Sequence, residues 1–429
     1  MKKYIILSIT LIGICRAAFP QEASEQTLRL TLKQAQDYAV QHNRTVWNAG
    51  LSVSEAQKKT WEAISAGLPQ VNASVNYQNM MGFNMSFAGM SIAMPPTSNF
   101  QATVTQLLFN GSYWVGIKMS KIGEKMSETA RLQAELDVKQ QTQSAYYAIL
   151  TAEENKKLLV QNLKNVEALA RSAEDMVRVG VAEQTDADRM KLQVVTMTNG
   201  ITMVERSIEL AYNLLRFQLG VDTNAKVELT QTLEGLMESE DVQGTLLKNF
   251  DVSSNYNMQL MDGQISLTDM QINLERAAAM PTVAAFYSYT YKIAKSTFDM
   301  SPNNVIGLQA SIPIFASGQR HVRTQQAKIN LEKATNNRDL LTDQLLMQEK
   351  QLRFNLKNAI ESFELQKEAV NVSQRVFESV SRKFQKGTAS SLDVTIASSD
   401  LLQAQTNYIN AMMQVFSAQT ELAKLLNSL

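Results

Sequence analysis

Two long stretches of the sequence contain no proline. One runs from 112 to 179 and the other from 319 to 386, so the two are equal in length. Proline interrupts the interior of an α-helix, and both stretches consist largely of helix-forming residues. At a rise of about 1.5 Å per residue, each would form a helix about 100 Å long, several times the usual length in globular proteins. The sequence therefore predicts an elongated molecule rather than a compact domain.

The two stretches belong to a pattern that occurs twice along the chain. Three pairs of residues are each separated by 207 positions, namely Gly111 and Gly318, Gly180 and Gly387, and Asp186 and Asp393. The segment at 66–78 is likewise echoed in pattern by the segment at 278–290. A fixed spacing of this kind indicates an internal repeat, and two equal halves are the simplest explanation.

Shorter helices are expected beside the long ones. Residues 31–66 have apolar positions at helical spacing, with a break expected near Asn43, and residues 183–219 form a second such stretch. Each would be about 55 Å long, so that two short helices placed end to end match one long helix. We therefore expect pairs of helices that run along the whole length of a tube.

Two regions between the helices alternate between apolar and polar residues, which is the period of a β-strand with two different faces. The apolar positions are Val71, Ala73, Val75 and Tyr77; Phe100, Ala102 and Val104; Val283, Ala285, Tyr287 and Tyr289; and Ile306, Leu308, Ala310 and Ile312. We predict four strands of about ten residues each. Val75 and Leu308 are assigned to a lipid-facing side and Asn76 to a water-facing side.

The N-terminus has the features of a secretory signal peptide. Lys2 and Lys3 precede an apolar run that ends in small residues, and this run is too short to span a bilayer as a helix. We therefore expect residues 1–17 to be removed and the mature chain to be exported. Cys15, the only cysteine, lies in this segment. A lipid-modified cysteine usually follows a small residue rather than Ile14, and lipidation at Cys15 is left open.

The charge balance argues against a nucleic-acid partner. The whole chain has 41 basic and 41 acidic residues, and three of the basic ones lie in the signal peptide. The mature protein is therefore slightly acidic, and its charges are interspersed along the chain. A nucleic-acid-binding protein needs a concentrated basic surface, so no nucleic acid is expected among the partners.

The predicted strands suit a membrane barrel better than any helix of the chain does. Only helices and closed barrels cross a bilayer, and no mature segment is apolar enough for a spanning helix. Strands of about ten residues have the required length, and Tyr287, Tyr289 and Tyr291 suit the interface belts. Four strands cannot close a barrel and eight already fill its interior. The chain is therefore expected to oligomerise, with a trimer and a tetramer both open at this point.

The order helix, β-hairpin, long helix, turn and shorter helix, given twice after a signal peptide, resembles the TolC family of outer-membrane efflux proteins. The turn sequences VGVAEQTDADRMKLQ at 179–193 and KGTASSLDVTIASSDLLQAQ at 386–405 carry the closest likeness. Both are similar to the tip in which the family joins the two arms of a coiled coil. The resemblance covers essentially the whole mature chain.

This resemblance implies a mixed α and β membrane protein. Three chains would form a trimeric β-barrel, with four strands per chain and twelve in total, continued by a long α-helical barrel of coiled-coil hairpins. Such a homotrimer lies in the outer membrane of a Gram-negative bacterium and extends into the periplasm. It meets a periplasmic adaptor (membrane fusion) protein and an inner-membrane transporter, in tripartite efflux or type I secretion. The transporter supplies the energy, so the subunit needs no cofactor and no catalytic residue.

The expected organisation follows from the repeat and the resemblance. The signal peptide is 1–17, the first structural repeat 18–220, an inter-repeat linker or equatorial segment 221–245, and the second structural repeat 246–429. The β-hairpins are placed at about 70–109 and 282–315, and the tip turns at about 180–186 and 387–393.

The resemblance also implies which residues act at the tips. Contact with the adaptor is assigned to Gly180, Val181, Ala182, Gly387, Thr388 and Ala389. The structural alternative is that each glycine only permits the turn, with Thr185 or Ser391 capping the next helix.

The gate is assigned to Asp186, Phe384 and Asp393. In relatives the aspartate matching Asp186 is held by a tyrosine and an arginine, but Phe384 and Ala389 stand at those positions here. We therefore expect the closed state to be held differently, with Lys386 or Arg178 as candidates.

Asp393 matches the first of two constriction aspartates in the family, whereas Ile396 occupies the second position. A trimer would then present one ring of three carboxylates, which favours cations. The alternative is that Asp393 is a capping or solvated residue.

Other functions have less support. An enzyme is not expected, because His42 and His321 lie on predicted helices without ligand-spaced partners, and no catalytic or metal-binding motif occurs. A non-conducting structural or adhesion coiled-coil envelope protein is the remaining alternative, and the absence of a pore would identify it. The methionine-rich segment 80–99 could bind soft metal ions, but the transported substrate is not determined.

Overall fold

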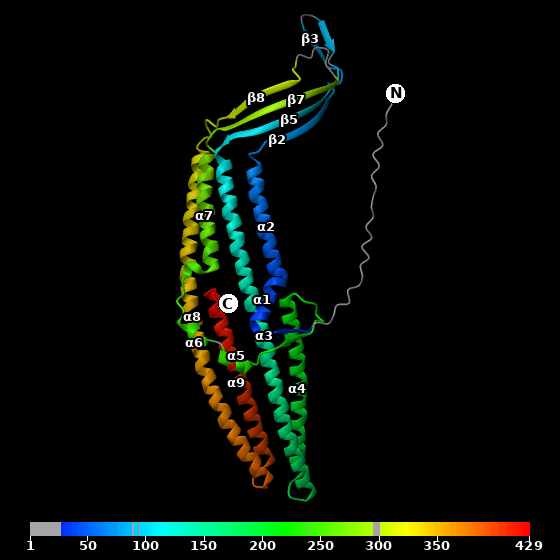
Figure 1. Cartoon of the computed structure of the whole chain (residues 1–429), viewed down its shortest axis with the longest axis vertical. Coiled ribbons are helices and arrows are strands. Elements are labelled where there is room, and N and C mark those ends of the chain that lie inside the picture. Colours follow the sequence, from blue (N-terminus) through cyan, green and yellow to red (C-terminus); the bar gives the residue numbers. More distant parts are fainter. Residues whose placement is uncertain (1–26, 88–89, 94, 240, 295–300) are drawn as a thin grey trace, which may run out of the picture.

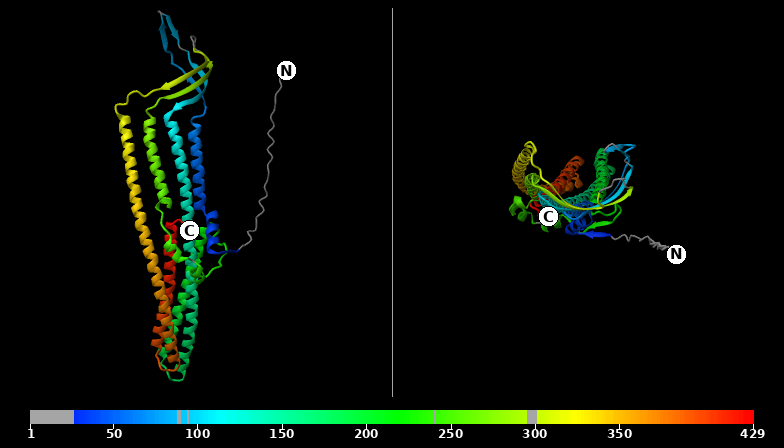
Figure 2. Two further views of the ribbon diagram at one scale, coloured as in Figure 1. Left: turned by 60° about the vertical axis from the view of Figure 1, so that its left-hand side comes forward. Right: turned by 90° about the horizontal axis from the view of Figure 1, so that it is seen from above.

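The computed structural model describes residues 27–87, 90–93, 95–239, 241–294 and 301–429. The expected signal peptide, with Cys15, lies outside the described residues. The molecule is elongated, with a β-sheet at one end and long helices that run away from it (Figure 1). Viewed along the long axis, the sheet and the helices form a curved wall rather than a closed ring (Figure 2).

Helices are present in the stretches predicted at 31–66, 112–179, 183–219 and 319–386, and two further helices belong to the second half of the chain. Together they are α1 (Leu32–His42), α2 (Arg44–Ser65), α3 (Gly111–Arg178), α4 (Gln184–Leu219), α7 (Tyr256–Ala277), α8 (Gln319–Gln385) and α9 (Ser391–Leu425). The two long helices, α3 and α8, contain 68 and 67 residues, as the proline-free stretches predict. The break predicted near Asn43 is confirmed, because this residue ends α1 and caps α2.

The helices form two tiers that share α3 and α8. In the tier near the sheet, α3 packs between α2 and α7, and α7 packs on α8. In the other tier, α3 packs on α4 and α9, and α9 packs on α8. As a result, α2 and α4 lie along one edge of the wall, and α8 lies along the other.

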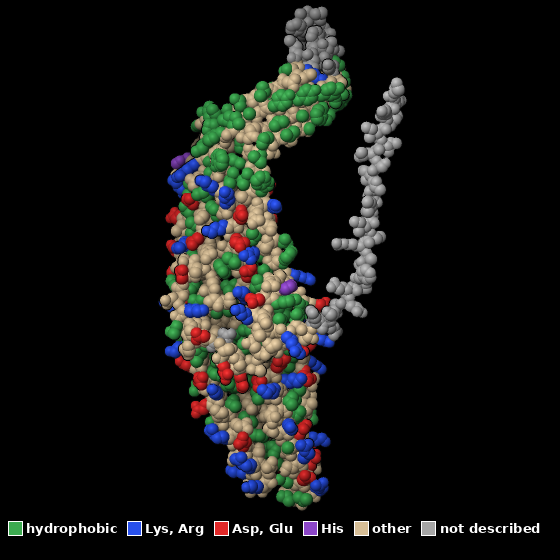
Figure 3. Space-filling model, in the orientation of Figure 1, with side chains coloured by type: hydrophobic (Ala, Val, Ile, Leu, Met, Phe, Trp, Pro, Cys, Tyr) green, Lys and Arg blue, Asp and Glu red, His purple; other side chains and the backbone are tan. Residues whose placement is uncertain are grey.

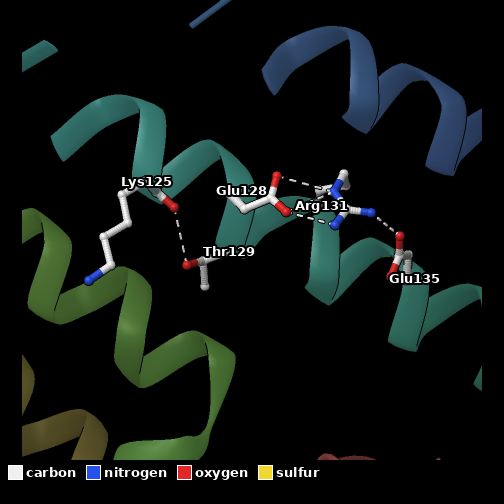
Figure 4. Close-up of polar contacts among 5 residues, drawn as sticks. All are labelled: Lys125, Glu128, Thr129, Arg131 and Glu135. Atoms are coloured by element: carbon white, nitrogen blue, oxygen red, sulfur yellow. Dashed lines mark hydrogen bonds and ion pairs between the residues drawn. The ribbon is translucent and has the colours of Figure 1, made fainter. Parts of the chain in front are cut away.

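Side-chain contacts within α3 help to stabilise this helix, whose surface is largely polar. Arg131 forms an ion pair of 2.7 Å with Glu128, one turn earlier, and also contacts Glu135, one turn later (Figure 4). The Thr129 hydroxyl donates to the Lys125 carbonyl oxygen at 3.2 Å. Pairs at these spacings add a few tenths of a kcal/mol each, so the helix depends mainly on its packed face.

A small equatorial layer covers the middle of the molecule, and the sequence did not predict its elements. These are β1 (Leu28–Leu30), which pairs in parallel with β6 (Val227–Leu229), and α5 (Leu233–Ser239), α6 (Val242–Leu247) and the 3-10 helix η1 (Val252–Ser254). They cover the largest apolar core, where Tyr146 and Phe416 are fully buried. The Tyr146 hydroxyl donates to the Leu30 carbonyl oxygen at 3.2 Å, which ties β1 to α3.

The main sheet contains four antiparallel strands in the order β2-β5-β7-β8. Their bounds are β2 (Gln70–Gln78), β5 (Thr97–Asn110), β7 (Thr282–Ala294) and β8 (Asn304–Ser311). The four predicted strands are therefore confirmed. The connection between β2 and β5, which we would expect to be a long loop, has structure of its own, because part of it forms a hairpin of β3 (Asn84–Phe87) and β4 (Met90–Ala93).

The strand register gives the sheet one apolar and one polar face. Val75 lies opposite Phe100, which lies opposite Tyr291 on the next strand. On the other face, the Ser288 hydroxyl accepts a hydrogen bond of 2.8 Å from the Gln101 amide. Hydrophobic side chains gather over the sheet, whereas the charged residues are spread over the helices (Figure 3). The predicted alternation is thus present in three dimensions.

None of the helices in the described part of the chain is both long enough and apolar enough to cross a membrane.

The two faces predict opposite responses to a charge. Val75→Arg and Leu308→Arg place an arginine on the apolar face, where contact with lipid would make it cost about 2–4 kcal/mol near the bilayer centre. Asn76→Arg places the same charge on the polar face. We expect the first two variants to reduce the amount of assembled protein in outer-membrane fractions, and Asn76→Arg to leave it near the wild-type level. Equal amounts of all three would show that the faces are assigned wrongly.

Candidate functional site: the paired helical tips

The end of the molecule far from the sheet consists of two helical turns. One joins α3 to α4 and the other joins α8 to α9, and the two turns lie side by side (Figures 1 and 2). The turns predicted at 180–186 and 387–393 therefore lie next to each other, although they are far apart in the sequence.

Both turns end their long helix in the same way. Gly180 and Gly387 have positive φ angles of 77° and 72°, a backbone conformation that strongly favours glycine. The Val181 N–H donates to the Met176 carbonyl oxygen, and the Thr388 N–H donates to the Lys383 carbonyl oxygen, both at 2.9 Å. These are the bonds of a Schellman motif. Each glycine therefore has a clear structural role in the turn.

The residues at the N-caps of the helices after the turns differ from those suggested by the sequence. Glu183 precedes α4 and Ser390 precedes α9, so Thr185 and Ser391 are not the capping residues. The Ser390 N–H and hydroxyl donate to the Asp393 carboxylate at 2.9 Å and 2.8 Å, and the Asp393 N–H donates back to the Ser390 hydroxyl. Asp393 thus belongs to a capping box.

These contacts lower the pKa of Asp393. The larger cause is the backbone N–H of Ser390, followed by its hydroxyl, because both stabilise the charged carboxylate. A lowered pKa means that the cap is fully formed at neutral pH. Its contribution to stability is lost only as the pH falls through that lowered pKa.

Asp186 has a different partner from those expected. The Ser391 hydroxyl, at the start of α9, donates to the Asp186 carboxylate at the start of α4, and Ser391 is 1% exposed. Arg178, a candidate partner, instead pairs with Asp175 at 2.6 Å. Within the described residues Lys386 forms no ion pair with Asp186 either. The polar contact between the starts of α4 and α9 is therefore a hydroxyl on a carboxylate, and Ser391 was not identified in this role from the sequence.

A buried apolar group, here called the tip cluster, joins the two hairpins above this contact. Its members are Leu169, Ala173, Ala187, Met190, Phe377, Phe384, Val394, Ala397 and Leu401. They come from α3, α4, α8 and α9. Phe384 is 3% exposed, and burial of such a side chain contributes about 1.5–3 kcal/mol.

Phe384 was selected from the sequence because it lacks the hydroxyl of the family's tyrosine. The structure gives it a role of its own, as an apolar contact at the centre of the tip. Phe377 lies seven residues earlier in the same cluster, and this heptad spacing was the signal that could have revealed the cluster.

The residues assigned to adaptor contact differ in exposure. Gly180, Val181, Gly387 and Thr388 are exposed, whereas Ala182 and Ala389 are half-buried. Ala389 also packs against the tip cluster. Val179 and Val181 are about 70% exposed, so the first turn presents two apolar side chains to solvent beside the exposed Arg178 and Glu183.

The two histidines lie on helices, as predicted. The His42 ring stacks on Tyr38 with 4.0 Å between ring centroids, and His321 lies in the first turn of α8 near Gln325. Among the residues that the structure describes, no group of three or more His, Cys, Asp or Glu side chains is placed to hold a metal ion.

Comparison with known proteins places most of the described chain in one family. The sequence model of the family described as "Outer membrane efflux protein" matches residues 27–221 and 253–428. The outer membrane protein TolC of Escherichia coli K12 is 22% identical over 448 aligned positions, which cover 100% of this chain and 87% of that protein. The outer membrane protein TolC of Vibrio cholerae is 20% identical over 392 positions, covering 88% and 87%.

Solved structures share the fold. The CmeC outer membrane channel of Campylobacter jejuni has a TM-score of 0.76 at 17% identity, covering 92% of this chain and 85% of that one. The outer membrane protein VceC of Vibrio cholerae has a TM-score of 0.75 at 16% identity, covering 92% and 95%.

Phe384→Ala tests the role of the tip cluster. Removing a buried phenylalanine costs about 3–5 kcal/mol, so the two hairpins should separate more readily. With spin labels on the exposed residues Val181 and Thr388, the distribution of label distances should broaden and shift to longer values. Gln385→Ala, at the exposed neighbouring position, is the matched control and should leave the distribution unchanged. An unchanged distribution in Phe384→Ala would exclude the cluster as the contact that holds the tips together.

Proposed function

The chain belongs to the outer membrane efflux protein family, and on that premise we propose that three copies of it assemble into one continuous duct through the outer membrane and the periplasm. The chain acts as an outer-membrane efflux channel.

The open edges of the single chain carry this proposal. Among the described strands of the sheet, β2 and β8 each have only one neighbour, so one side of each strand offers unpaired backbone groups. Strand β8 of one copy can pair with β2 of the next. Three copies then give a closed barrel of twelve strands, wide enough for a lumen, whereas two copies would fill the interior with side chains.

The helices are open along the same two edges. On α8, seven of the exposed apolar residues are separated by intervals of 7 or 11 positions, namely Val322, Ile329, Leu340, Met347, Phe354, Leu365 and Val372. On α4, the exposed residues Leu192, Met203, Leu210 and Phe217 have the same intervals. Such spacing is typical of helices that pack side by side in coiled coils. It supports a contact between α8 of one copy and the α2 and α4 edge of the next.

Two tandem repeats make up each chain in this proposal. The helix, strand pair, long helix and shorter helix occur in the same order before and after the equatorial layer. The two tip glycines, Gly180 and Gly387, share the same left-handed backbone conformation. Three chains would therefore place six similar hairpins around the duct.

Conduction through the duct is passive in this account. The polar face of the sheet lines the lumen and the apolar face contacts outer-membrane lipid. The relatives are channel proteins rather than enzymes, which supports a subunit without catalysis. An inner-membrane transporter supplies the energy, and the cargo class is not assigned.

The binding of soft metal ions by the methionine-rich segment 80–99 stays a prediction from the sequence, because the side chains at 85–94 lie outside the described residues.

The closed gate is the paired tips. The tip cluster and the contact between Ser391 and Asp186 hold the two hairpins of one chain together. Asp393 caps α9, and in a trimer three such carboxylates would also form a ring at the inner end of the duct. Ile396, one turn later, is 51% exposed, so an apolar ring follows the charged one.

Recordings from purified protein in planar bilayers test the channel and its charged ring together. We expect long-lived, cation-preferring single-channel currents from the wild-type protein. Asp393→Asn should form the same pore with reduced cation selectivity and weaker block by multivalent cations. Absence of any pore would contradict the proposed function, and unchanged selectivity in Asp393→Asn would contradict only the carboxylate ring.

Cross-linking in cells tests the adaptor contact. Cysteines at Ala182 and Ala389 should form adducts with the helical tips of the periplasmic adaptor, because helix-turn-helix tips can meet in a coiled-coil manner. Ser207→Cys, an exposed position on α4 well away from the tip, serves as the control and should give no adduct. If the two tip cysteines also give none, the tip glycines keep only their role in the turns.

A further inference from the structure

Near the equator, α2 begins where α4 ends, although these helices are not consecutive in the chain. Asn43 lies between them and is 5% exposed. Its side-chain oxygen accepts from the Thr45 N–H at 2.7 Å, and its side-chain nitrogen donates to the Gln218 carbonyl oxygen at 2.8 Å. One amide thus caps the start of α2 and satisfies a carbonyl in the last turn of α4, where helical partners are lacking.

The second half of the chain contains the same arrangement. Asn255, which is 4% exposed, accepts from the Asn257 N–H at 3.0 Å and donates to the Leu425 carbonyl oxygen at 3.2 Å. It therefore links the start of α7 to the end of α9. In both cases a backbone N–H lies on one side and a carbonyl on the other, so the orientation of the amide is determined.

The two junctions correspond residue by residue on the acceptor side. Gln218 and Leu425 keep the spacing of the internal repeat, and so do Gly220 and Asn427, which both have positive φ angles, of 69° and 52°. Asn43 and Asn255 do not keep this spacing, because the second half enters its junction through a different segment. This difference hid the correspondence in the sequence.

The surroundings of the two junctions differ. At the first, Gly220 lies against His42, and an added Cβ would be only 2.4 Å from the His42 carbonyl oxygen. At the second, the Asn427 side chain donates to the Ser254 carbonyl oxygen at 2.6 Å. The second junction also borders a polar cavity of about 470 Å³, lined by Asp137, Gln140, Gln348 and Glu421 among others.

In each half, one helix runs unbroken past the equator and the other path is made of two helices joined by this amide. Helices α3 and α8 are continuous, so they transmit bending along their length. The paths α2 to α4 and α7 to α9 have no covalent continuity at the junction. Movement of the lower hairpins relative to the upper tier would therefore bend α3 and α8 and change the angle between the paired helices at the two asparagines, in the manner of a hinge.

We propose that Asn43 and Asn255 are positioning residues of the gate, which hold the lower hairpins at the angle that brings the tips together and act as the pivots when the tips separate. This inference rests on the proposed function, in which the tips close the duct. The side-chain bonds to Gln218 and Leu425 are the contacts that keep the closed angle.

Asn255→Asp separates the two roles of the amide. The carboxylate still accepts from the Asn257 N–H, so the cap on α7 remains. It cannot donate to the Leu425 carbonyl oxygen, and it faces the negative end of α9. Asn257→Asp is the matched control, because the Asn257 side chain accepts from Gln133 at 2.8 Å and an aspartate can do the same.

Single-channel recording and label distances at the tips measure the effect. We expect Asn255→Asp to increase the open fraction of the channel about fivefold or more, since a buried carbonyl loses its partner in the closed state. The distance between spin labels on Val181 and Thr388 should lengthen in parallel. Asn257→Asp should match the wild type in both measurements. A lower melting temperature with an unchanged open fraction and unchanged distances would overturn the proposal, because it would leave the asparagine a purely structural role.

A milder variant covers the case in which Asn255→Asp does not assemble. Asn427→Gly removes only the bond to Ser254 and places glycine where the first junction already has Gly220. We expect a smaller increase in the open fraction, in the same direction, and wild-type behaviour would overturn the proposal. If the wild-type protein forms no pore, the proposed function fails, and the label distances still decide whether the asparagines set the angle of the tips.

Discussion

A backbone N–H or C=O group without a hydrogen-bond partner is costly wherever water cannot reach it, and the sheet of this chain ends in two rows of such groups. The outward side of β2 and the outward side of β8 have no partner strand among the described residues. The apolar face formed by Val75, Phe100 and Tyr291 suits lipid, where open edges are not tolerated. The rest of the architecture follows from closing these edges with further copies of the same chain.

Closure of the sheet also brings the helices of neighbouring copies into contact. Because α2 and α8 continue the two edge strands away from the sheet, copies that meet at the strands also meet along the helices. The exposed apolar residues of α8 and α4 lie on these edges, while the single chain buries its own core around Tyr146 and Phe416. At the far end the tip cluster joins the two hairpins through Phe384 and its apolar neighbours.

Long, regular elements could be predicted from the sequence because every residue of such an element repeats the same signal. The absence of proline indicated the two long helices, the alternation indicated the strands, and the glycines indicated the tips. Membership in the family followed from the order of these elements together with the two tip sequences. Contacts between distant segments could not be predicted. Ser391 reaches Asp186 across 205 positions, and Asn255 reaches Leu425 across 170, so no local pattern marks either pair.

The central claim is that the edges of the sheet are closed by neighbouring copies, and amide hydrogen exchange on the protein purified in mild detergent tests it most directly. The account predicts that the amides of Gln70–Gln78 and Asn304–Ser311 exchange as slowly as those of the central strands β5 and β7, since every strand has two neighbours in the closed barrel. Rapid exchange confined to β2 and β8, with slow exchange in β5 and β7, would show that the edges stay open and would contradict the account.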